Sequence, residues 1–309
     1  MSVVVVYNPK SGRGRGLSVA AALVDHLRGR GMGVVSASIR DQWRDLLGGA
    51  RVLVAAGGDG TMHAVASAVL DSGVPVYQCP LGTENLFARE FGMSREPVEI
   101  GDAIERGRTR RVDVGMCNGR AFVIMCSVGC DANVIHRLDR VRNGAISHSS
   151  YAMPTFREVM RPAIPKLRVT VDGRVEVDGG RGQLVVANSR QYAMRIDPAR
   201  DARVDDGVLD VVFLPHRTVA GAVARGARAR MRWEDGRGVV RARGAVIRVE
   251  SVGGEAVYQF DGEASGRPAG SVDASLTAGL AAHERLPMEI SVRAGALTVL
   301  EGAKLQTTK

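Results

Sequence analysis

The sequence predicts an α/β first half followed by an all-β second half. Strand and helix patterns alternate from the N-terminus to about residue 110, and after Val114 strand patterns become frequent while helix patterns become sparse. Such alternation is typical of a parallel sheet covered by helices, and a run of strands with few helices indicates an antiparallel domain. The length of 309 residues agrees with two domains, because one domain usually takes about 100–200 residues.

Each element of the first half follows from its local pattern. Ser2–Tyr7 is a continuous β-branched run, which is typical of a strand buried on both faces. Glycines separate the elements that follow, and glycine commonly marks turns. We therefore predict further strands at residues 34–39, 51–56 and 74–78, and helices at residues 17–28, 62–70 and 84–91.

The second half is predicted to be an antiparallel β domain with few helices. Gly, Asp and Asn turns separate its strand patterns. Residues 270–286 show only weak strand signals. The predicted strands lie at residues 122–126, 166–171, 183–188, 208–213, 245–249 and 257–260, and the predicted helices at residues 145–160, interrupted at Pro154, and 219–232.

Charge and hydropathy exclude some classes of protein. The chain has 42 Lys and Arg against 33 Asp and Glu, a net charge of +9, and nearly all of its cations are arginines. Attraction to phosphate or to an anionic membrane surface is one explanation, and a genome-wide codon bias is the other. No apolar stretch reaches the ~18–20 residues of a membrane helix, and aromatic residues for base stacking are scarce. We therefore expect a cytoplasmic protein, with at most peripheral contact to an anionic membrane and no nucleic-acid partner.

The chain has four cysteines, too few for a disulfide scaffold of this length. Cys126 and Cys130 are four residues apart, but no second pair with a matching His follows them. Zinc binding is therefore disfavoured, and we expect buried free thiols.

Three polar loops with glycines follow the first, third and fourth predicted strands of the first half. They run over residues 8–16, 55–61 and 80–89, and the second reads Ala-Ala-Gly-Gly-Asp-Gly-Thr. The carboxyl ends of parallel strands meet at one sheet edge, where ligands bind in open α/β sheets. Free N–H groups in such loops bind anions, and Thr61 is placed to cap the next helix. A tight turn alone explains one or two of the glycines, so we predict a nucleotide triphosphate site.

The loop sequences carry a family resemblance. Asn-Pro-x-Ser-Gly, Gly-Gly-Asp-Gly-Thr and Pro-Leu-Gly-Thr-x-Asn-x-x-Ala-Arg occur in this order and resemble the diacylglycerol kinase catalytic family, which includes soluble bacterial lipid kinases and sphingosine and ceramide kinases. Gly-Gly-Asp-Gly alone is shared with NAD kinases and phosphofructokinases. Further matches extend the resemblance over almost the whole chain: Arg111-Val-Asp113-Val-Gly, Ser127-Val-Gly-Cys-Asp131-Ala, Asp205-Asp-Gly-Val-Leu-Asp210 and Phe260-Asp261-Gly-Glu263.

The resemblance implies an ATP-dependent lipid kinase of two domains. A Rossmann-like, three-layer α/β nucleotide-binding domain would take residues 1–115 and a returning strand at about residues 288–300. An antiparallel β-sandwich for the lipid would take residues 116–287, with the active site in the cleft between the domains. The implied cofactors are ATP and Mg²⁺, and the acceptor is a diacylglycerol-like or sphingoid-like lipid. An NAD kinase-like enzyme and a non-catalytic nucleotide- or lipid-binding protein stay open as alternatives.

The resemblance also implies roles for single residues. Asp261 resembles the catalytic base, with Glu263 beside it, although Asp261-Gly262 by itself is a hairpin-turn signal. Asp59 and Asp113 match positions linked to magnesium, Asp205, Asp206 and Asp210 match a turn that can hold a second magnesium, and Asp131 matches a position on the acceptor side. The implied nucleotide contacts are Asn8, Ser11, Gly12, Arg13, Gly57, Gly58, Asp59, Gly60, Thr61, Gly82, Thr83 and Asn85.

One position departs from the family pattern. The asparagine of the third loop is usually followed by Asp, but Asn85 is followed by Leu86. Glu84 is a candidate substitute for the missing carboxylate. The departure makes a weakened or altered kinase an alternative.

Overall fold

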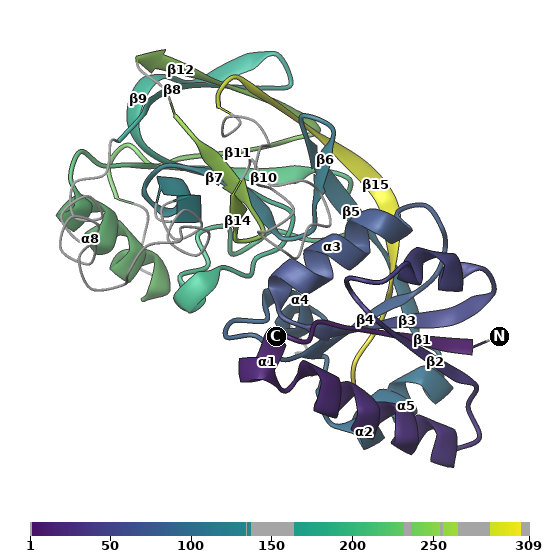
Figure 1. The fold of residues 1–309 in the computed structure, drawn as a ribbon. Coiled ribbons are helices and arrows are strands. Elements are labelled where there is room, and N and C mark those ends of the chain that lie inside the picture. Colours follow the sequence, from purple (N-terminus) through teal and green to yellow (C-terminus); the bar gives the residue numbers. More distant parts are fainter. Residues whose placement is uncertain are drawn as a thin grey trace. The chain divides into compact units, whose positions relative to one another are not determined.

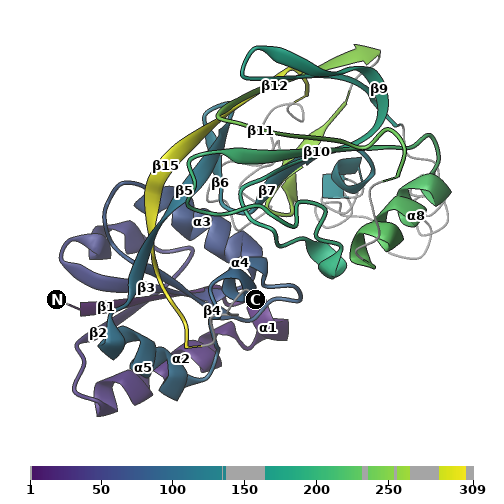
Figure 2. The ribbon, with the colours of Figure 1, turned by 180° about the vertical axis from the view of Figure 1, so that it is seen from behind.

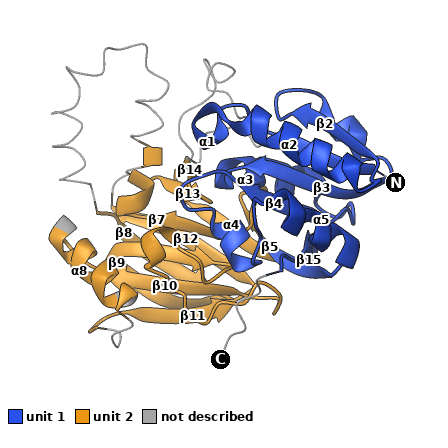
Figure 3. Cartoon of the chain, turned by 90° about the horizontal axis from the view of Figure 1, so that it is seen from below, with its two compact units in different colours: residues 1–114, 294–309 blue, residues 115–293 orange. Residues whose placement is uncertain are grey.

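The computed structural model describes residues 2–133, 135–136, 164–231, 236–253, 256–264 and 285–303. The chain divides into two units, residues 1–114 with 294–309 and residues 115–293 (Figure 3). Two strands, β5 (Thr109–Cys117) and β15 (Met288–Leu300), contribute residues to both units. Among the described residues, no helix combines the length and the apolar character needed to span a membrane.

The first unit is built on a parallel sheet. β3 pairs in parallel with both β1 and β4, and β1 pairs with β2. Val299 of β15 extends the sheet by pairing in parallel with Val76. The central valines of β1 are buried, as its unbroken β-branched run predicts. The bounds are β1 (Ser2–Tyr7), β2 (Val34–Ser38), β3 (Ala50–Gly57) and β4 (Val76–Pro80).

Helices cover both faces of this sheet. α2 and α5 lie on one face, and α3 and α4 on the other (Figures 1 and 2). The three-layer α/β arrangement predicted from the sequence is therefore confirmed. The bounds are α1 (Ser11–Gly14), α2 (Gly16–Gly29), the 3₁₀ helix η1 (Trp43–Leu47), α3 (Asp59–Val69), α4 (Leu86–Glu90) and α5 (Pro97–Arg106).

The second unit is antiparallel, as predicted, and one long strand joins its layers. The first half of β9 (Arg174–Ala187) pairs with β8 (Lys166–Val171). Its second half pairs with β7 (Met125–Val128) and β10 (Leu209–Pro215). Buried aliphatic and aromatic side chains from both layers form one core, including Leu167, Leu184, Val211, Ile247 and Tyr258.

Several predicted bounds differ from the structure. The strand predicted at residues 122–126 is two strands, because the chain between them turns its amides toward a carboxylate described below. β5, β11 and α5 were not predicted, and the helix predicted at 145–160 lies outside the described residues. The remaining bounds are β6 (Arg120–Phe122), η2 (Ala193–Arg195), α8 (Val219–Arg230), β11 (Val240–Gly244), β12 (Val246–Gly253), β13 (Tyr258–Phe260) and β14 (Glu263–Ala264).

Candidate functional site

The three glycine-bearing loops meet at the carboxyl edge of the parallel sheet. The Asn8 side-chain amide donates to Thr61 Oγ1 at 3.2 Å, joining the first loop to the second. The Leu81 N–H donates to the Gly57 carbonyl at 3.0 Å, joining the third loop to the second. The predicted convergence of the loops is therefore confirmed.

Glycines permit this close approach. A β-carbon on Gly82 would lie 2.8 Å from the Cα of Gly58, and one on Gly57 would lie 2.3 Å from Thr61 Oγ1. Both distances are shorter than real β-carbon contacts. The loops therefore present bare backbone, which can approach a phosphate closely.

The first loop turns through left-handed conformations. Gly12 has φ 61° and Arg13 has φ 59°. The Asn8 side-chain oxygen accepts the Lys10 N–H, and the Asn8 carbonyl accepts the Ser11 N–H. A left-handed arginine is unusual for an L-residue, and such conformations concentrate at functional sites. The predicted contacts Ser11, Gly12 and Arg13 thus lie in a tightly folded turn.

The third loop is closed by the side chain of Asn85. Its oxygen accepts the Gly82 N–H and its amide donates to the Gly82 carbonyl, both at 2.8 Å. Thr83, at the tip, is exposed. Leu86 begins α4 and is only 7% exposed, and the Glu84 carboxylate lies 3.5 Å from Arg89 Nη1. Asn85 therefore shapes the loop, whatever contact it makes with a ligand.

Helix α3 starts earlier than predicted. Its first residue is Asp59 and its N-cap is Gly58, without a side-chain cap. The prediction that Thr61 caps this helix is wrong, because Thr61 lies inside it and its buried hydroxyl contacts Asn8. Asp59 Oδ1 accepts the Phe87 N–H at 3.4 Å, and a carboxylate in the first turn complements the helix dipole. Gly60 follows it in the same turn.

Asp113 has a different partner. It is buried in β5, and its Oδ1 accepts the Gly295 N–H of β15 at 2.7 Å. In the described part of the chain, no group of three or more His, Cys, Asp or Glu could hold a metal. Magnesium in kinases is usually bound by one or two carboxylates and the substrate phosphates, so the magnesium roles of Asp59 and Asp113 stay predictions.

Gln78 is a contributor that the sequence analysis missed. It is fully buried in β4, where its amide donates to the Gly57 carbonyl at 3.3 Å and its oxygen accepts the Ala88 N–H at 2.8 Å. It therefore links the second loop to α4. A polar residue inside an otherwise apolar buried strand was the available signal.

In the second unit, Asp261 forms the turn of the β13–β14 hairpin. Asp261 and Gly262 have φ 51° and 83°, the pattern of a two-residue hairpin turn, as the Asp-Gly dipeptide by itself indicates. The carboxylate is 5% exposed and accepts three backbone N–H bonds, from Val123 at 2.8 Å, Ile124 at 2.8 Å and Met125 at 3.0 Å. Its role as a base, and the role of Glu263 opposite Phe260, stay predictions.

Asp131 lies in a mostly buried polar network. Its Oδ2 accepts hydrogen bonds from the Ser127 hydroxyl at 2.5 Å and the Tyr192 hydroxyl at 2.6 Å. The Gln259 amide donates to Ser127 Oγ at 2.6 Å. Burial, followed by the Asp131 charge, raises the pKa of Tyr192 well above its ordinary value. Tyr192 and Gln259 were not found from the sequence, because they are far from Asp131 along the chain.

The acidic turn that contains Asp205, Asp206 and Asp210 is in contact with Arg243. The Arg243 guanidinium contacts Asp206 Oδ2 and lies 3.4 Å from Asp210 Oδ1, and Asp205 lies 3.7 Å from Arg203. The pKa of Asp210 is raised because burial outweighs the lowering effect of Arg243. Its Oδ2 is buried without a hydrogen-bond partner. Asp206 and Asp210 thus share Arg243, a cation that a metal would have to displace, while Asp205 contacts Arg203 instead.

Two family models match the chain. The model of the diacylglycerol kinase catalytic domain matches residues 2–117. The model of the YegS C-terminal NAD kinase beta sandwich-like domain matches residues 124–301. The two matches therefore extend over both units.

Individual relatives agree with these models. A diacylglycerol kinase from Mycobacterium tuberculosis is 28% identical over 224 residues, 68% of this chain and 72% of that protein. The Pseudomonas aeruginosa protein named "Probable lipid kinase YegS-like" is 31% identical over 201 residues, 58% of this chain and 62% of that protein. An uncharacterized Synechocystis protein is 23% identical over 166 residues, which span 54% of this chain and 38% of that protein.

A solved structure shows the same fold. The crystal structure of a diacylglycerol kinase from Bacillus anthracis matches with a TM-score of 0.67 at 18% identity, over 98% of this chain and 97% of that one. The predicted fold class, an α/β domain followed by a β-sandwich-like domain, is confirmed.

Proposed function

Since this chain belongs to the diacylglycerol kinase family, with a diacylglycerol kinase catalytic domain followed by a YegS-type C-terminal domain, we propose that it is a lipid kinase that transfers the γ-phosphoryl group of ATP to a lipid hydroxyl. The observation that carries the proposal is the meeting of three bare-backbone loops, with Gly58 packed against Gly82. Such loops suit the phosphates of a nucleotide.

The residues at the carboxyl edge of the parallel sheet would have different roles in the proposed reaction. Phosphoryl transfer depends mainly on positioning and on neutralising the triphosphate charge. The backbone N–H groups of residues 57–61, the N-terminus of α3 and the Arg13 guanidinium would bind the phosphates. Asp59, at the start of α3, would hold a magnesium ion, which when bound neutralises phosphate charge. The hydrogen bond from Phe87 to Asp59 would orient that carboxylate.

Asp261 is proposed to take the proton of the lipid hydroxyl. A positioned carboxylate can act as a general base, and three backbone N–H bonds fix the position of this one. The proposed acceptor is a diacylglycerol-like or sphingoid-like lipid. Glu263, two residues further along the hairpin, would assist from β14.

The test is transfer of labelled γ-phosphate. ATP is offered with diacylglycerol, phosphatidylglycerol, sphingosine or ceramide in mixed micelles, and with NAD as a separate acceptor. A labelled lipid that is lost in Asp261→Asn, with the melting temperature measured beside it, supports the proposal and identifies the acceptor. Labelled NADP without labelled lipid would replace it with an NAD kinase.

A second candidate follows from Leu86. Its buried side chain stands where the family pattern has a carboxylate, which favours a nucleotide- or lipid-binding protein without turnover. This candidate predicts that ATP raises the melting temperature while no phosphorylated product forms with any acceptor. Product formation by the unaltered chain would exclude it.

A further inference from the structure

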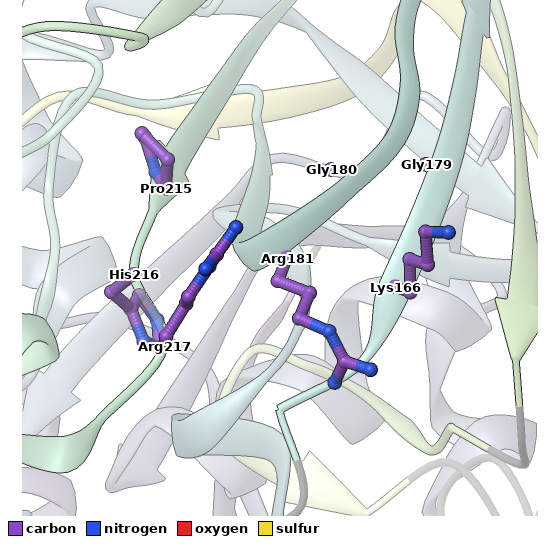
Figure 4. Close-up of a pocket in the computed structure, with 7 residues that line it drawn as sticks. All are labelled: Lys166, Gly179, Gly180, Arg181, Pro215, His216 and Arg217. Atoms are coloured by element: carbon purple, nitrogen blue, oxygen red, sulfur yellow. The ribbon is translucent and has the colours of Figure 1, made fainter.

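A basic pocket lies in the second unit, apart from every residue assigned above. Its volume is about 540 Å³. It lies at the start of β8, along the middle of β9 and at the end of β10 (Figure 4). The lining residues are Lys166, Gly179, Gly180, Arg181, Pro215, His216 and Arg217.

The lining is strongly cationic. Three of the seven residues carry a positive charge and none carries a carboxylate. Lys166 and Arg181 are direct partners across the antiparallel β8–β9 pair, and like charges in that position destabilise a sheet. Within the described part of the chain, neither of them nor Arg217 forms an ion pair. A bound anion would offset this repulsion.

A β-bulge makes room for the cations. Leu167 pairs with Gly180 and Arg168 pairs with Asp178, so Gly179 is left over between them. Gly179 has φ +68°, and a β-carbon on it would lie 3.0 Å from Lys166 Cε. Bulges commonly redirect side chains beside functional sites. This one leaves room for the Lys166 side chain over Gly179.

His216 also lines the pocket. The residue is 7% exposed, and its ring interacts with the backbone of Thr218. Burial lowers the pKa of this imidazole, so His216 adds a neutral polar side chain beside the three cations at neutral pH.

We infer that this pocket binds a phosphate group, either inorganic phosphate or the head of an anionic phospholipid. Guanidinium groups match phosphate oxygens with paired N–H bonds, and Figure 4 shows Arg217 extending toward Gly180 and Arg181. Three cations without a carboxylate suit a multiply charged phosphate better than a single carboxylate. The site uses only residues of the second unit and does not depend on the proposed kinase activity.

Charge reversal tests the site in the full-length chain. Arg217→Glu and Arg181→Glu change two exposed lining residues. Arg174→Glu is the matched control, because its side chain is 83% exposed on the same strand β9 and lies outside the pocket. Melting temperatures confirm that all three variants fold. Binding of inorganic phosphate is measured by calorimetry, and vesicle binding by flotation with phosphatidylcholine alone or mixed equally with phosphatidic acid.

The inference requires both pocket variants to lose about tenfold or more in affinity, the effect expected for a hydrogen bond to a charged group, while the control does not. Loss in the vesicle assay alone identifies a lipid headgroup, and loss in the phosphate assay alone identifies free phosphate. Phosphate that binds to the glycine loops would still bind to every variant. Comparing the pocket variants with Arg174→Glu therefore distinguishes binding in the pocket from binding at the loops. Equal binding by the pocket variants and Arg174→Glu, or no binding by the unaltered chain, would overturn the inference.

Discussion

Gly58 and Gly82 are packed backbone to backbone, so that a β-carbon on Gly82 would lie 2.8 Å from the Cα of Gly58. The two residues belong to loops that follow neighbouring parallel strands, β3 and β4. Their contact determines how close the second and third loops come. The geometry of the proposed phosphate site therefore depends on the absence of two side chains.

Replacing Gly82 with alanine is expected to weaken ATP binding about tenfold or more, which corresponds to about 1.4 kcal/mol. The added methyl group must push Gly58 or Asn85 away, because Asn85 Oδ1 would lie only 2.9 Å from it. Calorimetric titration with ATP measures the change. Gly29→Ala is the control, since nothing lies within 4 Å of its position. Equal ATP affinity in both variants would show that the loops do not form the site.

Asp261→Asn is expected to lower the free energy of unfolding by about 1–3 kcal/mol, the cost of leaving buried polar groups unsatisfied. Both carboxylate oxygens accept backbone N–H groups, and an asparagine has an N–H₂ group in place of one of them. Urea unfolding followed by circular dichroism measures the loss. Asp25→Asn, at an exposed position of α2, should change nothing. An unaltered stability for Asp261→Asn would mean that these bonds contribute little.

Local patterns predicted the strands and loops of the first unit. An unbroken β-branched run such as Ser2–Tyr7, for example, indicates a buried strand. Helix α5 was not predicted, although its buried residues Ile100, Ala103 and Ile104 follow helical spacing. Gly101 of this helix lies against the Arg30 side chain, which forms ion pairs with Asp102 and Glu105. Contacts of this kind join residues that are far apart in the chain, so the local periodicity of the sequence does not predict them.

The same limit applies to the candidate site. The Gly-Gly-Asp-Gly-Thr motif identified the loop, but Thr61 was misread as a cap because its partner, Asn8, lies 53 residues away. The metal role of the acidic turn stays a prediction, and its arginine partner was not found because Arg243 lies 37 residues from Asp206. The sequence motifs predicted which residues lie in the loops and turns. The hydrogen-bond and ion-pair partners of those residues became known only from the folded structure.

Arg243→Ala is expected to lower the free energy of unfolding by only about 1 kcal/mol or less, because the Arg243 side chain is 51% exposed and solvent screens its ion pairs with Asp206 and Asp210. Asp206 and Asp210 would then repel each other, and millimolar Mg²⁺ should raise the melting temperature of this variant more than that of the unaltered protein. Thermal unfolding with Mg²⁺ and with a chelator measures both effects. Arg203→Ala is the control, since that side chain is 68% exposed and 3.7 Å from Asp205. No response to Mg²⁺ in Arg243→Ala would contradict the metal role of the turn.

Cys130 is expected to react slowly with alkylating reagents at pH 8. The four cysteines are free, as predicted, and Cys130 is the least buried of them. Burial, assisted by the Asp131 carboxylate, raises the pKa of the Cys130 thiol from 9.0 to about 11. Because only the thiolate reacts, the folded protein should be alkylated about a hundredfold more slowly at pH 8 than the chain unfolded in urea. Peptide mass spectrometry after timed iodoacetamide treatment gives the rate at each cysteine.

The same raised pKa fixes the direction of a stability change. Between the ordinary pKa of 9.0 and about 11 the folded protein keeps a Cys130 proton that the unfolded chain has lost, so the free energy of unfolding falls as pH rises through this window. In Cys130→Ser this part of the fall should be absent, and the difference in stability between the two proteins should change with pH only above about 9. Rapid labelling of Cys130 at pH 8, or a pH dependence identical in Cys130→Ser, would show that the thiol is not held in its protonated form by burial beside Asp131.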